Sequence, residues 1–75
     1  MSKPTRITNS IRALRFARGE MTQAELAQRI GVTRQTIIAI EQGRYSPSLE
    51  VAFQIARVFK VPLDDVFQYP SEGGA

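Results

Sequence analysis

Two short segments with helical patterning are separated by one tight turn at Gly31, and this turn restricts the folds that the chain can adopt. Thr22 and Glu25 open the first segment with a capping box, in which each side chain accepts a hydrogen bond from the other residue's backbone N–H. Glycine adopts positive φ without a steric penalty from Cβ, so Gly31 allows the chain to reverse direction within a few residues. The sequence therefore predicts two helices, over about 23–30 and 34–42, that meet at an angle.

Small and apolar residues around this turn form a consistent packing pattern. Ala27, four residues before the glycine, is small enough for the following helix to approach closely. Ile37, six residues after the glycine, is placed to fill the angle between the helices, and Thr33 can cap the second one. The buried side is completed by Leu26, Ile30, Val32 and Ile40. This spacing predicts a helix-turn-helix whose second helix presents its far face to a DNA major groove, although an ordinary αα corner uses the same glycine geometry.

The rest of the chain also carries apolar residues at three- and four-residue spacing, and no strand pattern is present. Three more helices are expected: one over about 11–18 capped by Asn9 or Ser10, one from the Ser48 cap to Phe59, and a short one after Pro62. The apolar stripe of the fourth helix consists of Leu49, Ala52, Ile55, Ala56 and Phe59. The predicted fold is all-α, a compact five-helix bundle over residues 9–69, with a flexible basic arm over 1–8 and a disordered tail over 70–75.

Two residue types that serve most catalytic and metal sites are missing, because the chain contains neither cysteine nor histidine. Asp64 and Asp65 form the only adjacent carboxylate pair, and their place at the start of the fifth helix gives them a capping explanation. No apolar stretch approaches the ~20 residues of a membrane span, and the N-terminus lacks the apolar core of a signal peptide. We therefore expect a cytoplasmic domain that is not an enzyme and takes no metal, cofactor, membrane or small-molecule ligand.

Positive charge is concentrated in the first part of the chain. The 75 residues include ten Lys and Arg against seven Asp and Glu, a formal net charge of +3. Residues 1–44 hold eight basic and three acidic side chains (+5), whereas residues 45–75 hold two basic and four acidic ones (−2). A polyanion is therefore expected to dock on the first part of the chain.

Six segments occur together in an order and spacing that are more specific than any one of them. They are IRALR (11–15), MTQAELA (21–27), IGVTRQTI (30–37), IEQGR (40–44), PSL (47–49) and IA (55–56). With these segments, residues 9–67 resemble the phage-repressor-like helix-turn-helix regulators of bacteria, the Cro and lambda-repressor type of the XRE family. The resemblance implies a lambda-repressor-like domain that binds double-stranded DNA in a sequence-specific manner.

Three departures from the family pattern lie outside the predicted recognition helix. The loop over 18–21 is one residue longer than the commonest family spacing, and Pro62 replaces a common serine cap. Lys60 stands where the family often has a glycine that ends a helix, so a left-handed residue other than glycine is expected there.

The outward face of residues 34–42 holds the candidates for base reading. Arg34 can donate two hydrogen bonds to guanine O6 and N7, and Gln35 can pair with adenine N6 and N7. Arg34 can instead contact a phosphate or remain solvated, and Ile38 either packs on a thymine methyl or belongs to the core. The family positions that face bases or nearby backbone correspond to Thr33, Arg34, Gln35, Ile38 and Ala39.

Phosphate contacts are expected on both sides of this helix. The free N–H groups at the start of the second helix can bind a phosphate together with the Gln23 side chain, a role that the matching family glutamine has. The resemblance also allows Gln23 to support the residue at 34 or 35. The full phosphate set is Gln23, Arg44, Tyr45 and Thr22, with Arg12, Arg29, Lys3 and Arg6 as further basic residues that can equally be solvated.

The resemblance assigns Arg15 and Glu41 to a partly buried ion pair that serves stability rather than recognition. Because one small helix-turn-helix reads few base pairs, we also expect a homodimer that reads a palindromic operator, with half-sites ~34 Å apart. The interface is expected at the C-terminal helices and tail, on Val51, Val58, Phe67 and Tyr69. The alternative is that Phe67 and Val58 belong to the core and the chain pairs only on DNA.

These observations favour a transcriptional repressor that blocks a promoter by occupying it. A protein-interaction module of the antitoxin kind would use the same fold, but it would need a long extra segment to wrap its partner. The absence of such a segment counts mildly against this alternative.

Overall fold

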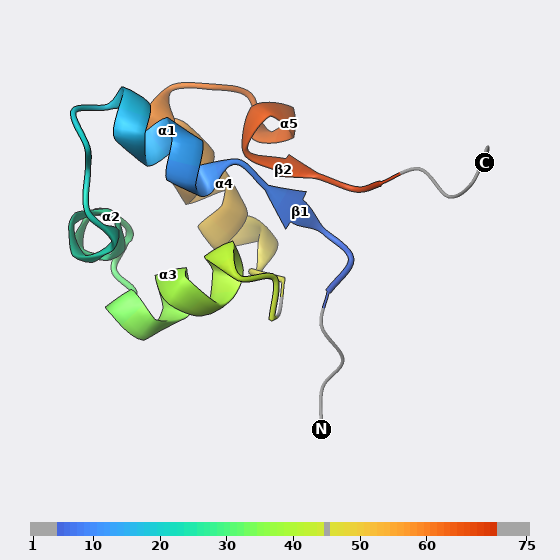
Figure 1. The fold of residues 1–75 in the computed structure, drawn as a ribbon. Coiled ribbons are helices and arrows are strands. Elements are labelled where there is room, and N and C mark those ends of the chain that lie inside the picture. Colours follow the sequence, from blue (N-terminus) through green and yellow to red (C-terminus); the bar gives the residue numbers. More distant parts are fainter. Residues whose placement is uncertain (1–4, 45, 71–75) are drawn as a thin grey trace.

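The computed structural model describes residues 5–44 and 46–70, and Figure 1 shows their arrangement. The elements in chain order are β1 (Thr8–Asn9), α1 (Ile11–Ala17), α2 (Gln23–Ile30), α3 (Arg34–Glu41), α4 (Leu49–Phe59), α5 (Leu63–Val66) and β2 (Phe67–Gln68). The predicted five-helix fold is confirmed. No helix in these two stretches is both long and apolar enough to cross a membrane.

Local capping signals explain where three of the helices begin. The Thr22 hydroxyl accepts a hydrogen bond from the Glu25 N–H at 3.0 Å, and the Glu25 carboxylate accepts one from the Thr22 N–H at 2.8 Å. Thr33 and Ser48 cap α3 and α4 in the same way, each accepting from the backbone N–H three residues later. These bonds satisfy donors that have no partner within the helix.

The first helix begins differently, because Asn9 rather than Ser10 supplies the side-chain cap. Ser10 occupies the N-cap position without a side-chain cap bond, and the Asn9 side-chain oxygen accepts from the Ile11 N–H at 3.2 Å. The Asn9 amide also donates to the carbonyl oxygens of Ile40 at 3.1 Å and Glu41 at 3.3 Å. One side chain therefore joins the start of α1 to the end of α3.

A short pair of strands is an addition to the all-α prediction. β1 and β2 are antiparallel, with Thr8 opposite Gln68 and Asn9 opposite Phe67. Two residues per strand are too few to show the alternation by which a strand is recognised in a sequence. The predicted arm over 1–8 therefore ends inside β1, while its residues 1–4 and residues 71–75 of the predicted tail lie outside the described parts.

Lys60 ends α4 in the left-handed conformation, at φ 57° and ψ 44°, as its place in the sequence predicts. The Val61 N–H then bonds the Ala56 carbonyl oxygen at 3.1 Å, which satisfies one of the last carbonyls of the helix. Arg18 also donates to the Phe59 carbonyl oxygen from the loop after α1.

The core lies where all five helices converge. Its fully buried large side chains are Phe59, Ile11, Leu26, Ile37, Ile40, Ile55 and Val66. Four of the five residues of the predicted apolar stripe of α4 are buried, whereas Leu49 is 72% exposed. Leu49 is the first residue of α4, so the helix provides packing neighbours on only one side of it.

Candidate nucleic-acid interface

The turn between α2 and α3 has the geometry that the sequence predicts. Gly31 has a φ of 76°, and the following Val32 N–H bonds back to the Ala27 carbonyl oxygen at 3.0 Å. Ala27 is buried, and Ile37 is completely buried in the angle between the two helices. This packing fixes the orientation of α3 relative to α2, so the far side of α3 faces away from the core (Figure 1).

The outward side of α3 presents a polar edge at its N-terminal end. Thr33, Arg34 and Gln35 are exposed, whereas Ile38 and Ala39 are half-buried. The Thr33 hydroxyl also lies 3.0 Å from the Thr36 hydroxyl, in addition to its role as the N-cap. The structure therefore brings the two long polar side chains of the predicted base-reading set to the surface, and leaves Ile38 partly accessible beside them.

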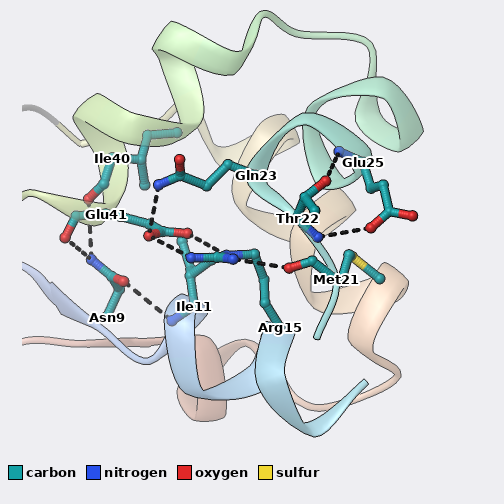
Figure 2. A network of polar contacts seen from close by, with 9 residues as sticks. All are labelled: Asn9, Ile11, Arg15, Met21, Thr22, Gln23, Glu25, Ile40 and Glu41. Carbon is teal, nitrogen blue, oxygen red and sulfur yellow. Dashed lines mark hydrogen bonds and ion pairs between the residues drawn. The ribbon is translucent and has the colours of Figure 1, made fainter. Parts of the chain in front are cut away.

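A bidentate ion pair joins α1 to Glu41, the last residue of α3 (Figure 2). The Arg15 Nε donates to Glu41 Oε2 at 2.7 Å, and its Nη2 donates to Glu41 Oε1 at 3.1 Å. The side chains are only 9% and 10% exposed, respectively. The remaining Arg15 nitrogen, Nη1, donates to the Met21 carbonyl oxygen at 2.9 Å, just before the cap of α2. All three guanidinium nitrogens are therefore used to join α1, α3 and the loop before α2.

Gln23 contacts the same carboxylate. Its side-chain nitrogen donates to Glu41 Oε1 at 3.2 Å, and the side chain is half-buried (Figure 2). Thr22, its neighbour in the predicted phosphate set, is exposed. The sequence pattern does not reveal the contact between Gln23 and Glu41, because the two residues are 18 positions apart and neither is unusual where it stands.

An open groove of about 730 Å³ connects these residues to the recognition edge. It runs between α1, the start of α2 and α3, and its lining includes Arg12, Phe16, Thr22, Gln23 and Arg34. Arg12 lies over the Phe16 ring, 5.4 Å from its centroid. Besides the paired Arg15 and Glu41, the groove therefore brings Arg12, Arg34 and the carboxylate of Glu20 to the same concave surface as the start of α2.

The other predicted phosphate contacts lie beyond α3. Arg44 is exposed, and its Nε donates to the side-chain oxygen of Gln42 at 2.8 Å. Tyr45 falls outside the described residues. Gln42 itself lines the groove, so Arg44 lies beside the end of the groove that α3 forms, whereas Thr22 and Gln23 line it from the start of α2.

The four residues expected at a dimer interface differ in their exposure. Val51, Val58 and Phe67 are half-buried and pack against the core, whereas Tyr69 is 66% exposed. Two exposed aromatic residues were not part of that expectation, namely Phe16 and Phe53, both at 53%. Phe53 lies one turn after Leu49 on α4, a spacing that could have indicated a second apolar stripe on that helix.

Comparisons with known proteins agree with this geometry. A family model described as Helix-turn-helix matches residues 11–66. An uncharacterised HTH-type transcriptional regulator of Archaeoglobus fulgidus is 50% identical over 56 residues, which are 75% of this chain and 79% of that protein. The cryptic phage CTXphi transcriptional repressor RstR of Vibrio cholerae is 37% identical over 59 residues, 79% of this chain and 52% of the repressor.

A solved structure shows the same fold. The crystal structure of a candidate DNA-binding protein from Bacteroides fragilis superposes with a TM-score of 0.71. The match covers 83% of this chain and 98% of that one, at 22% sequence identity.

Proposed function

Because the chain belongs to the helix-turn-helix family of XRE-type (Cro/C1-type) DNA-binding transcriptional regulators, we propose that it is a repressor that binds a palindromic operator as a homodimer. Repression works by occupancy of the promoter, in the cytoplasm on nucleoid DNA. The observation that carries the proposal is the exposed edge of α3 at Arg34 and Gln35, which the buried Ile37 and the Gly31 turn hold away from the core. The name of the phage repressor from Vibrio cholerae supports repression rather than activation.

Arg34 and Gln35 read base edges in the major groove in this proposal. Both stand in the first turn of α3, the part of a recognition helix that usually meets the bases. Arg34 pairs with a guanine and Gln35 with an adenine, because their side chains match the donor and acceptor pattern of those bases. Thr33, Ile38 and Ala39 flank them, and the accessible part of Ile38 packs on a thymine methyl.

Contacts with DNA phosphates lie on two sides of the base-reading residues in this proposal. Thr22 and Gln23 contact the backbone at the start of α2, and Arg44 and Tyr45 contact it beyond the end of α3. The positions of these residues support this arrangement, because Thr22 and Gln23 stand at the start of α2 and Arg44 follows the end of α3. The net charge of +5 on residues 1–44 adds the attraction that brings the duplex to this surface.

The dimer uses the C-terminal surface of Val51, Val58, Phe67 and Tyr69. The 66% exposure of Tyr69 and the partial exposure of the other three leave apolar area for a second copy. Tyr69→Asp would place a charge in this interface and is expected to shift the sedimentation profile toward the monomer. If the wild type is dimeric without DNA, an unchanged profile of Tyr69→Asp would reject this interface. A wild-type profile that is monomeric without DNA would favour pairing on DNA alone.

Selection from a pool of random duplexes, followed by sequencing, tests the function directly. A palindromic consensus with half-sites about one helical turn apart is the expected result, because it reports specificity and two-fold symmetry together. A single asymmetric site would reject the symmetric dimer while retaining base reading. No enrichment of any sequence would reject base reading and favour the protein-interaction alternative.

A further inference from the structure

Glu41 is fully engaged by partners from two other parts of the fold. Its Oε2 accepts from Arg15, and its Oε1 accepts from both Arg15 and Gln23. The two hydrogen bonds from Arg15 already neutralise the charge of Glu41 and occupy both of its carboxylate oxygens, so the ion pair does not require Gln23. The third contact connects this buried pair to the first residue of α2, on the surface that faces the groove.

We infer that Glu41 is a positioning residue for DNA binding, which acts by fixing the side-chain amide of Gln23. This inference rests on the proposed phosphate contact of Gln23. A carboxylate only accepts hydrogen bonds, so the Gln23 nitrogen must face Glu41 and the amide cannot rotate by half a turn without opposing two oxygen atoms. The amide is therefore held in one orientation before DNA arrives, with its second N–H available for a phosphate oxygen.

Arg15 offsets the electrostatic cost of a carboxylate close to the proposed DNA-binding surface. An uncompensated negative charge behind the DNA surface would repel the phosphates, whereas the guanidinium neutralises Glu41 from the inner side. Arg15 is itself held by the Met21 carbonyl oxygen at 2.9 Å, in the loop that leads into α2. The carboxylate is thus anchored from the core, and the anchor sets the position of a side chain on the surface (Figure 2).

A double-mutant cycle on the duplex obtained by selection tests the inference. Glu41→Asp keeps the charge but draws the carboxylate back by one methylene, which removes the contact with Gln23 and also weakens those with Arg15, so each affinity is corrected for the folded fraction of the variant. Glu41→Asp and Gln23→Ala are each expected to weaken binding roughly fivefold, the value of one hydrogen bond. The double variant should bind no more weakly than Gln23→Ala, because both changes remove the same interaction. Losses that multiply would overturn the inference.

A methylphosphonate scan of the same duplex provides a readout that loss of stability does not move. Each phosphate is replaced in turn by its uncharged analogue, and the affinity for each modified duplex is divided by the affinity of the same variant for the unmodified one. This ratio cancels any difference in folded fraction. The wild type should be sensitive at one phosphate that becomes insensitive in Gln23→Ala, and Glu41→Asp should lose sensitivity at that same phosphate.

Two control variants separate positioning from general effects. Gln28→Ala removes an exposed glutamine of α2 and should leave the scan unchanged. Ser48→Ala removes the cap of α4 and lowers stability, but should also retain the wild-type pattern. If Glu41→Asp keeps full sensitivity at the Gln23 phosphate, the inference is rejected while the proposed function stands. If the wild type selects no duplex at all, the proposed function is rejected first.

Discussion

Replacing Asn9 by alanine is expected to destabilise the fold by about 2–4 kcal/mol. The change removes the acceptor for the Ile11 N–H, and a lost helix cap costs ~1 kcal/mol. It also removes the amide that donates to the Ile40 and Glu41 carbonyl oxygens at 3.1 and 3.3 Å, where each bond contributes ~0.5–1.5 kcal/mol. For a domain of this size, the sum corresponds to a fall in Tm of roughly 8–32 °C.

Thermal and urea unfolding followed by circular dichroism measure this loss, with Ser10→Ala as the matched control. Ser10 is the adjacent residue and makes no side-chain cap bond, so its replacement should change the stability by less than ~0.5 kcal/mol. Asn9→Asp distinguishes the contribution of the α1 cap from that of the bonds to α3. It keeps an acceptor for the Ile11 N–H but places an oxygen, rather than an N–H, against the two carbonyl oxygens of α3. It should remain less stable than the wild type. Equal stabilities of Asn9→Ala and Ser10→Ala would refute the reasoning.

Three further changes test recognition and backbone strain. Arg34→Ala should relax base preference at one position of each half-site by ~1–3 kcal/mol, measured on single-substituted duplexes, and equal losses on selected and random duplexes would exclude base reading. Arg44→Ala should reduce the slope of log affinity against log salt by about 1, and an unchanged slope would contradict a phosphate contact. Lys60→Gly should be about 0.5–1 kcal/mol more stable than Lys60→Ala in urea unfolding, because relief of the left-handed conformation exceeds the entropy cost of glycine. The opposite order, which is normal inside a helix, would show that this residue is not strained.

Much of the fold was predictable because its signals are local. Thr22 and Glu25 lie three residues apart, and Gly31 ends α2 in the left-handed conformation that the turn requires. A capping box and a glycine act within one helical turn, so their consequences can be derived without knowledge of the tertiary structure. The same holds for Ser48 at the start of α4.

The features that sequence reasoning missed depend on segments that meet from far apart. Asn9 was one of two possible caps for α1, but its second role requires the end of α3 to lie beside it. The partner of Gln23 is a carboxylate 18 residues away, which helical periodicity within one element cannot reveal. Leu49 belongs to the apolar stripe of α4 by its spacing, but it is exposed, because burial at the end of a helix depends on what covers that end.

The pairing of β1 with β2 has a consequence for synthesis on the ribosome. Thr8 is among the first of the described residues to be synthesised, but its partner Gln68 follows 60 positions later. The Ser10 N–H likewise cannot form its hydrogen bond until the Val66 carbonyl oxygen has been synthesised. The corner formed by α2 and α3 can collapse while translation continues, because its contacts are close in sequence. Asn9, which bonds the carbonyl oxygens at the end of α3, lies in β1, and β1 can pair with β2 only after residues 66–68 have left the exit tunnel. We therefore expect the α2–α3 corner to form before β1 pairs with β2, because its contacts are closer in sequence.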